Sequence, residues 1–548
     1  MTDTGKGDLL VEKWTSSICA VLTQEGVSPT CAHVTKLSGG KRTGSWIEGF
    51  SPAALSEQLR LIAAERSETA DTIEIVIGHN EHSILRNGAA KLPRQIERGL
   101  TGLAIRRGET TKRICPSVML SRNKTFPEAF DALARSFPGN ESTPKVDAGK
   151  TENLDISSFS TRQFVIPSLS ADAKPLSVFR GKPVVPLEEV TLDRVSALAR
   201  SLADWMKKHV AGNGKLSYCY HPSDDTYAPN TNRIREFMGT VALFKAARFF
   251  NDSEMLSLAE KNLHYNIGEY YRNEHAYGII VEGKKVKLGA AALAALAIRQ
   301  SEHKALYNKQ FTRLMRLTDR MWQNTGSFRT FLRPSDFDGT CQNFYPGETL
   351  LLWAECWIET RDDGLWTKIE TSFNHYREWH RANRNPAFVP WHTQACYLLW
   401  EVTGERHFQD FILEMNDWLL PYQQWDQITA FPDAQGRFYD PDKPYGPPHA
   451  SSTGVYLEGL IDAFRVARSI GDEVRALRYA LTIRRGLRNV MQLQYSTSYE
   501  CSAYADGAMA FGGVRTTEYN NVIRIDNVQH NLMAVLKILQ TDGFIWTA

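Results

Sequence analysis

The feature that most constrains the fold is an alternation of two kinds of helical segment after residue 187. Six apolar segments rich in small residues begin near Asn232, Lys287, Pro346, Pro390, Ser452 and Asp526. Six amphipathic segments lie between them, at roughly 190–210, 253–270, 302–322, 363–383, 405–420 and 472–492. A helix that is apolar all round is buried, whereas one with a single apolar face lies at the surface. The pattern therefore predicts an inner and an outer layer of helices.

The connections between these segments differ in length at the two ends. Short turns such as 251–254, 361–364, 403–405 and 471–473 use Gly or Asn to end one helix and Asp, Ser or Glu to begin the next. The connections at the other end are long and rich in Pro, Gly and aromatic residues, as in 211–231 and 421–451. Twelve helices in six pairs with this pattern predict an (α/α)6 toroid over residues 185–548. A linear stack of helical repeats would not need long irregular loops at one end only.

The first part of the chain has a different pattern. Residues 72–78 alternate like a strand, 52–65 and 126–136 have helical spacing, and 103–107 with 112–118 form a possible hairpin. Residues 1–136 therefore predict a smaller α+β domain, which makes the whole chain mainly α. Residues 137–184 are polar and begin with a stretch rich in Ser, Thr, Pro, Gly and Asn, so they predict a linker.

Composition excludes several classes of function. The chain has 64 basic and 62 acidic residues, a net charge of +2, so no overall field would attract nucleic acid. It has no run of about 18 apolar residues, which predicts no membrane span, and no apolar stretch near residue 1, which predicts a cytoplasmic protein. Its 8 cysteines include no CxxC pair, and no nucleotide-binding fingerprint occurs, so we expect neither metal nor cofactor.

The candidate site residues share one location, the beginnings of the apolar segments. In a toroid these beginnings meet at the end that carries the long loops, so the sequence predicts one concave, polar and aromatic pocket there. The residues in question are Asn232, Arg235, Lys287, Tyr345, Glu348, Trp391, His392, His449, Ser452, Glu458, Arg524, Asp526 and His530. Several of them also suit a purely structural role, because Asn232, Ser452 and Asp526 fit helix N-caps and Glu348 fits a first helical turn.

Two kinds of chemistry fit these residues. Glu348 and Asp526 are the first candidates for a carboxylate pair, with Asp224 and Glu518 behind them. Such a pair would hydrolyse a glycosidic bond lying between its two members. His392, His449 and Tyr345 are further proton-transfer candidates, and together with His530 the histidines would suit chemistry at a carbon centre. The remaining residues would bind substrate: Trp391, Arg235, Asn232, Arg524, His530 and Lys287. The alternatives are a scaffold protein that binds a glycan or peptide, and a partner that processes a peptide or lipid product.

Two stretches carry a resemblance to known families. Residues 343–352, Asn-Phe-Tyr-Pro-Gly-Glu-Thr-Leu-Leu-Leu, resemble the "YPGE" helix start common in carbohydrate-active (α/α)6 toroids. Residues 524–530 resemble the Arg-x-Asp-(x)3-His segment of the D-glucuronyl C5-epimerase C-terminal domain. Similar hairpins occur in N-acylglucosamine 2-epimerase-like proteins and in several glycosidase and lyase families. The resemblance implies an enzyme that acts on a sugar or oligosaccharide, by glycoside hydrolysis or by sugar or uronate epimerisation.

The N-terminal region is similar in layout to another family. Residues 99–119 and 126–133 resemble the late strands and last helix of the AMME-syndrome candidate protein family. That family's Leu-Arg-Gly-Cys-Ile-Gly signature is missing, and Lys-Arg-Thr-Gly-Ser-Trp-Ile-Glu-Gly at 41–49 stands roughly in its place. The resemblance implies a diverged domain, to which we assign no catalytic role.

Overall fold

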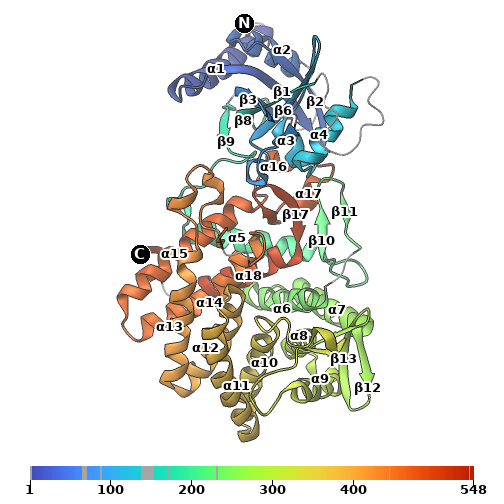
Figure 1. Cartoon of the computed structure of the whole chain (residues 1–548), viewed down its shortest axis with the longest axis vertical. Coiled ribbons are helices and arrows are strands. Elements are labelled where there is room, and N and C mark those ends of the chain that lie inside the picture. The colour runs from blue at the N-terminus through green and yellow to red at the C-terminus, as the bar shows by residue number, and fades with distance from the viewer. Residues whose placement is uncertain are drawn as a thin grey trace.

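The computed structural model describes residues 3–64, 71–86, 89–137, 154–170, 172–229, 232–442, 445–541 and 543–547. Figure 1 shows a smaller domain built on a sheet at the N-terminal end and a larger body of paired helices below it. The chain passes from the first to the second once, after strand β9 (Leu176–Val178).

The larger body is a closed ring of helices. Within the described residues its inner layer consists of α6 (Arg233–Phe250), α8 (Leu288–Gln300), α10 (Tyr345–Thr360), α12 (Val389–Thr403), α14 (Ala450–Ser469) and α18 (Ile525–Leu539). Each inner helix packs against the next one, and α18 returns to α6. The predicted (α/α)6 toroid is therefore confirmed.

An outer layer of amphipathic helices surrounds the ring. It consists of α5 (Leu192–Lys208), α7 (Ser253–Tyr270), α9 (Asn308–Met321), α11 (Asp363–Ala382), α13 (Arg406–Leu419) and α15 (Glu473–Leu493). The turns from inner to outer helices have the predicted chemistry. Asn251 ends α6 in a left-handed conformation with φ 51°, and the Asp252 carboxylate then accepts the Met255 N–H. Asp362 and Asp472 cap α11 and α15 in the same way.

Glycines allow the inner helices to approach closely. A Cβ on Gly347 of α10 would lie 2.6 Å from Cβ of Trp391, and one on Gly289 of α8 would lie 2.0 Å from Oε2 of Glu348. Gly239 and Gly454 similarly face α18. No side chain fits at such distances, so these positions set the spacing of the ring.

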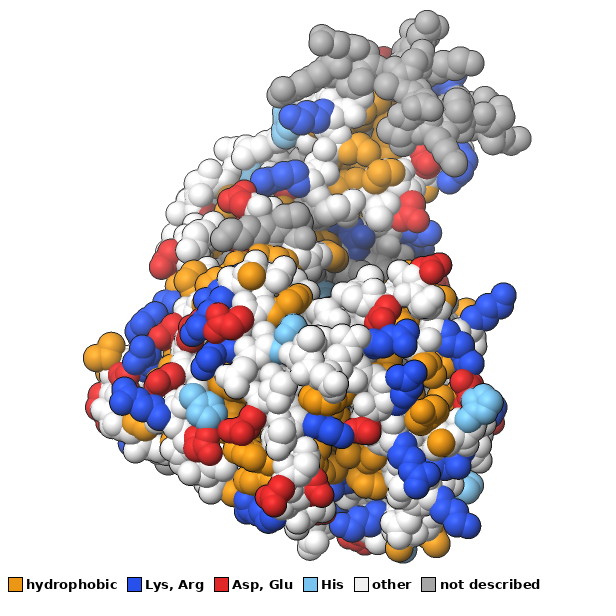
Figure 2. Space-filling model, turned by 60° about the horizontal axis from the view of Figure 1, so that its bottom comes forward, with side chains coloured by type: hydrophobic (Ala, Val, Ile, Leu, Met, Phe, Trp, Pro, Cys, Tyr) orange, Lys and Arg blue, Asp and Glu red, His pale blue; other side chains and the backbone are white. Residues whose placement is uncertain are grey.

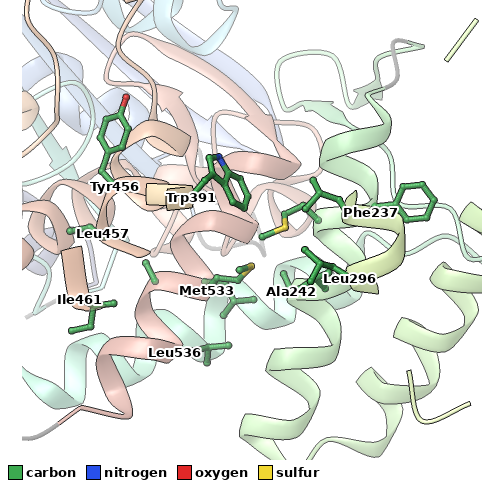
Figure 3. Close-up of a cluster of buried hydrophobic side chains, with 14 of the residues drawn as sticks. Phe237, Ala242, Leu296, Trp391, Tyr456, Leu457, Ile461, Met533 and Leu536 are labelled. Atoms are coloured by element: carbon green, nitrogen blue, oxygen red, sulfur yellow. The ribbon is translucent and has the colours of Figure 1, made fainter. Parts of the chain in front are cut away.

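Apolar side chains fill both faces of the inner layer (Figure 3). Trp391, Met533 and Leu536 lie toward the interior of the ring, whereas Phe237 points away from it. The Phe237 ring meets Tyr270 of the outer layer at a centroid distance of 6.4 Å. Burial on both sides explains why the inner segments are apolar around their whole circumference.

The N-terminal domain contains an antiparallel sheet in the order β2-β1-β3-β8-β6-β7, with β9 paired to β8. Its strands are β1 (Pro29–Ser38), β2 (Lys41–Glu48), β3 (Thr72–Ser83), β6 (Thr101–Arg107), β7 (Thr110–Ile114) and β8 (Asp155–Ile166). Helices α1 (Asp3–Gln24) and α2 (Pro52–Ala64) share a core with β1 and β3, and α4 (Phe126–Arg135) packs beside β6 and β7.

Strand β8 corrects the prediction of a linker over residues 137–184. It lies between β3 and β6, with Ile73 opposite Ile166 and Leu103 opposite Ser158. Apolar residues do not alternate regularly over 156–166 (Ile-Ser-Ser-Phe-Ser-Thr-Arg-Gln-Phe-Val-Ile), so the strand has no period-2 signal, and its partners come much earlier in the sequence. Residues 138–153 lie outside the described residues. The predicted second hairpin strand ends at Ile114 because Pro116 starts helix α3 (Pro116–Ser121).

The long loops form two small sheets at the starts of the inner helices. One has the order β11 (Thr226–Tyr227), β10 (Cys219–His221), β17 (Asn520–Arg524), β16 (Arg515–Thr517), and the other β12 (Tyr271–Glu274), β13 (Tyr277–Glu282), β14 (Lys285–Lys287), β15 (Phe331–Arg333). Asn521 Nδ2 donates to the carbonyls of Leu120 and Ser121, so β17 also contacts the N-terminal domain.

The surface agrees with the near-neutral composition. On the face that Figure 2 shows, basic and acidic side chains are interspersed over the helical body. Among the described helices, none combines the length and apolar character that crossing a bilayer requires.

Candidate active site at the loop side of the ring

Asp526, in the first turn of α18, is held by two arginines. Its Oδ2 accepts Nε of Arg235 from α6 at 2.6 Å, and its Oδ1 accepts Nε of Arg524 at 2.9 Å. Both guanidinium groups lie near the Tyr218 ring, 5.5 and 5.6 Å from its centroid. Burial alone would raise the pKa of Asp526, but Arg235 and Arg524 lower it well below its usual range. Asp526 is therefore a fixed anion.

Glu348, in the first turn of α10, differs from Asp526 in that its carboxyl is uncharged. The side chain is buried, and Oε2 has no hydrogen-bond partner among the described residues. Burial raises the pKa of Glu348 to about 8, although Arg235 and Lys287 oppose the rise. Glu348 is therefore largely protonated at neutral pH and can donate a proton. Arg235 influences both carboxyls, which ties them to one site.

His530 of α18 is oriented by a buried carboxylate. Its Nδ1 lies 2.7 Å from Oε1 of Glu458 in α14, and Glu458 has no solvent exposure. Because a carboxylate accepts, Nδ1 carries the proton and the partly exposed ring leaves Nε2 for a ligand. The Trp391 indole meets the imidazole edge-on at 6.1 Å and 76°. His530 lies four residues after Asp526, so both project from one face of α18.

His449 lies at the margin of this cluster. It caps α14, accepting the Ser452 N–H at Nδ1 over 3.2 Å, and the Ser451 hydroxyl lies 2.6 Å from the same atom. Burial lowers the pKa of His449 to about 4, and Arg524 adds to the effect. The ring is therefore neutral, and its electrostatic links to Arg524 and Asp526 place it beside them.

Three other predicted residues border the cluster from neighbouring inner helices. Lys287, at the start of α8, pairs with Glu282 Oε1 at 2.8 Å. Tyr345 is buried at the start of α10, and burial, with Cys341 and Glu348 adding to it, raises the pKa of its hydroxyl. Asn232 caps α6 by accepting the Arg235 N–H at 3.3 Å, and so fixes the turn that carries the arginine.

His392 does not join these polar groups. Its imidazole stacks on Phe388 with centroids 3.7 Å apart and planes 7° from parallel, and Tyr376 lies 5.4 Å away. Burial lowers its pKa well below the usual value, and its Nε2 has no partner among the described residues. His392 is a neutral member of an aromatic layer between α11 and α12.

The sequence did not indicate every member of the site. Glu458 was a candidate only because it lies near the start of an inner helix. Its pairing with His530 depends on how α14 and α18 face each other. Tyr218, just before β10, and Glu282, at the end of β13, come from the long loops, and nothing local in the sequence distinguishes them. Only their proximity to Arg235 and Lys287 in the fold gives them a place in the site.

A possible metal-ligand group lies elsewhere, in the outer layer. Glu370 of α11 and Glu405 and His407 at the start of α13 present ligand atoms within 4.8 Å of one another. All three side chains are half-buried, and His407 Nδ1 already lies 3.3 Å from Glu405 Oε2. The group belongs to the other end of the helices from the Arg235–Asp526 cluster.

No family model and no curated protein sequence matches this chain. Among solved structures, it is similar to a D-mannose isomerase at a TM-score of 0.47 and 13% identity, over 64% of this chain and 98% of that one. It is also similar to cellobiose 2-epimerase from Bacillus thermoamylovorans B4167, at 0.47 and 11%, over 64% and 99%. An alpha-1,6-mannanase from Salegentibacter sp. HEL1_6 matches at 0.44 and 12%, over 63% and 99%. These values describe a likeness of chain fold alone.

Proposed function

We propose that the loop-side cluster is the active site of a carbohydrate-active enzyme that moves a proton at a carbon of a sugar, as in epimerisation or isomerisation. The observation that carries this proposal is the 2.7 Å contact between His530 Nδ1 and the buried Glu458, beside Trp391. A carboxylate in that position fixes the imidazole tautomer and stabilises the imidazolium once Nε2 has taken a proton. Trp391 offers an apolar surface suited to a sugar ring.

Glu348 supplies the complementary acid. In the open-chain form of a sugar, His530 Nε2 removes the proton from the carbon beside the carbonyl, and the electron pair moves to the carbonyl oxygen. That oxygen takes the proton of Glu348, whose pKa of about 8 keeps the acid available at neutral pH. Return of a proton to the opposite face of the same carbon gives an epimer, and the new hydroxyl then returns its proton to Glu348. Return of a proton to the neighbouring, former carbonyl carbon gives an isomer, and the hydroxyl on the first carbon loses its proton to become the new carbonyl.

The surroundings of Asp526 weigh against a hydrolytic carboxylate pair. Both oxygens of Asp526 already accept hydrogen bonds from Arg235 and Arg524. A carboxylate engaged in this way is a weak nucleophile and a weak base. We therefore give Asp526 a positioning role, holding two guanidinium groups over Tyr218, where their remaining N–H groups suit the oxygens of a polar substrate. His392, in its aromatic layer, receives no proton-transfer role.

The test is incubation of the full chain with a panel of mono- and oligosaccharides in heavy water. Deuterium in an unbroken sugar, detected by NMR and mass spectrometry, is the expected result. His530→Gln and Glu348→Gln should each lower the rate by about 10²-fold or more, the scale of general acid–base catalysis. His264→Gln, which removes an exposed histidine from α7, should leave the rate unchanged.

Two outcomes would refute the proposal. New reducing ends without deuterium in the sugar would mean hydrolysis instead. Full exchange activity in His530→Gln would remove His530 from the mechanism.

A second candidate is a glycan-binding protein without catalysis. The observation that favours it is the dense ion pairing of Arg235, Arg524 and Asp526, which makes a rigid platform beside Trp391. In that case glycan binding would survive Glu348→Gln and be lost in Trp391→Ala, and no sugar would take up deuterium.

A further inference from the structure

A cavity opens toward the opposite end of the ring, among the middle and C-terminal turns of the inner helices. Its volume is about 490 Å³, within the range of small-molecule sites. Its walls come from α6, α10, α12, α14 and α18, and the apolar part includes Phe249, Leu351, Met533 and Leu536. No residue of the Arg235–Asp526 cluster lines it, so this cavity is separate from the loop-side cluster at the other end of the ring.

The carboxylates of this cavity already have partners. Asp462 of α14 is buried and pairs with the ammonium of Lys537 from α18 and, at 3.4 Å, with Arg465. Lys537 also donates to the Glu458 carbonyl at 2.8 Å. The two other carboxylates are engaged as well, Glu355 with Arg299 and Glu401 with the Tyr397 hydroxyl.

The donors of Gln394 and Lys245 have no partner among the described residues. The Gln394 Nε2 group is buried and has no hydrogen-bond partner among the described residues, although its side chain lines the cavity. The Lys245 ammonium forms no ion pair with any described carboxylate, and it also lines the cavity. An unpaired buried donor such as the Gln394 amide is costly unless a ligand or water satisfies it, whereas the Lys245 side chain is half-buried and its ammonium is within reach of water.

The helix ends do not account for these donors. Basic residues stabilise helix C-termini, and two of them here do so directly. Arg248 donates to the Gln300 carbonyl, and Arg465 donates to the Lys537 carbonyl at 2.8 Å. Lys245 lies more than a turn before the end of α6, and no described carbonyl accepts from it. Lys245 and Gln394 are thus free to bind a ligand that brings acceptor oxygens.

We propose that this cavity is a binding site for a compact organic anion, with a phosphate or carboxylate group held by Lys245 and Gln394. The apolar wall formed by Phe249, Met533 and Leu536 would contact the body of the ligand. The site is independent of the chemistry at the loop-side cluster, because its residues do not take part in that chemistry.

The experiment is calorimetric titration of the full chain with glucose 6-phosphate and with glucuronate, using uncharged glucose as the reference. At least one anion should bind at millimolar concentration or below. Lys245→Gln should weaken that binding by about tenfold or more, the loss expected for one charge-assisted hydrogen bond. Lys245→Arg should retain most of it. The preferred anion identifies phosphate or carboxylate as the recognised group.

Two control variants test whether the binding belongs to this cavity. Lys309→Gln makes the same charge change on an exposed residue of α9 and should leave binding unchanged. Glu348→Gln alters the loop-side cluster and should also leave binding unchanged. The proposal is overturned if neither anion binds, if Lys245→Gln binds as tightly as the unmodified protein, or if Lys309→Gln or Glu348→Gln weakens binding as much as Lys245→Gln does.

Discussion

At the scale of single residues, Glu348 and Asp526 show how surroundings decide the charge of a carboxyl. Both are buried in first turns of inner helices, where the helix dipole favours an anion. Asp526 has two guanidinium groups in contact and stays ionised. Glu348 has only more distant positive charges and Gly289 against its Oε2, so burial dominates and the proton stays. Two carboxyls in equivalent positions therefore have different charge states.

Glu348 should make stability depend on pH. An ordinary glutamate releases its proton near pH 4.5, whereas folded Glu348 keeps it to about pH 8. Its contribution is fully present below the lower value and is lost as pH rises to the higher one, by up to ~1.4 kcal/mol per pH unit. We expect the denaturant midpoint to fall less steeply between pH 5 and 8 in Glu348→Gln than in the unmodified protein. Glu302→Gln, on the surface, is the control, and parallel curves for all three proteins would contradict the assignment.

Some residue-level features could be predicted from the sequence and others could not. The gathering of polar residues at the starts of the inner helices followed from the order of the helices. Asn232 caps α6, as predicted from its residue type and position. The burial of His392 had a local signal, because Phe388 precedes it by four residues on one helical face. The pairing of His530 with Glu458 had none, since it depends on the rotation of two helices 72 residues apart.

At the scale of elements, the sequence predicts the features that local contacts determine and misses those that distant contacts determine. The inner and outer helices follow from apolar periodicity and capping residues, both of which act within a few positions. Strand β8 takes its place from β3 and β6, whose paired residues precede it by roughly 50 to 90 positions. The sequence of β8 has no regular alternation, and nothing local in it indicates which earlier strands it pairs with.

Gly347 tests whether close helix approach sets the ring. Gly347→Ala places a methyl group 2.6 Å from Cβ of Trp391 and 2.9 Å from Cδ2 of His392, so α10 and α12 must separate. We expect a loss of about 1–3 kcal/mol in the free energy of unfolding, the usual cost of overpacking. Gly268→Ala, in the outer helix α7 with open space around it, should be neutral or stabilising by up to ~1 kcal/mol. Denaturant titration of both variants decides, and equal effects would mean that Gly347 does not limit the packing.

At the scale of the whole molecule, the N-terminal domain is fastened to the loop side of the ring by buried charges. Arg180, just after β9, donates to the carbonyls of Arg98 and Ile96 in its own domain and to Asp433 in a long loop of the toroid. Two residues further on, Lys182 pairs with Glu500 at 3.2 Å. The segment that connects the two domains is thus held in place by buried ion pairs, and its residues lie within the stretch that the sequence predicts to be a linker.

Arg180 should therefore control how the two domains hold together. Its side chain and that of Asp433 are only 1% and 3% exposed, so Arg180→Met would leave a buried carboxylate without its partner. Removing one member of a buried pair costs about 3–5 kcal/mol, whereas replacing both by apolar residues is often close to neutral. We expect Arg180→Met to lower the unfolding midpoint, and the double variant Arg180→Met/Asp433→Leu to recover most of the loss. Arg94→Met, which alters an exposed arginine of the same domain, is the control for charge. The double variant could instead be as unstable as Arg180→Met. In that case the two domains are held together by the hydrogen bonds from Arg180 to the carbonyls of Arg98 and Ile96, and not by its pairing with Asp433.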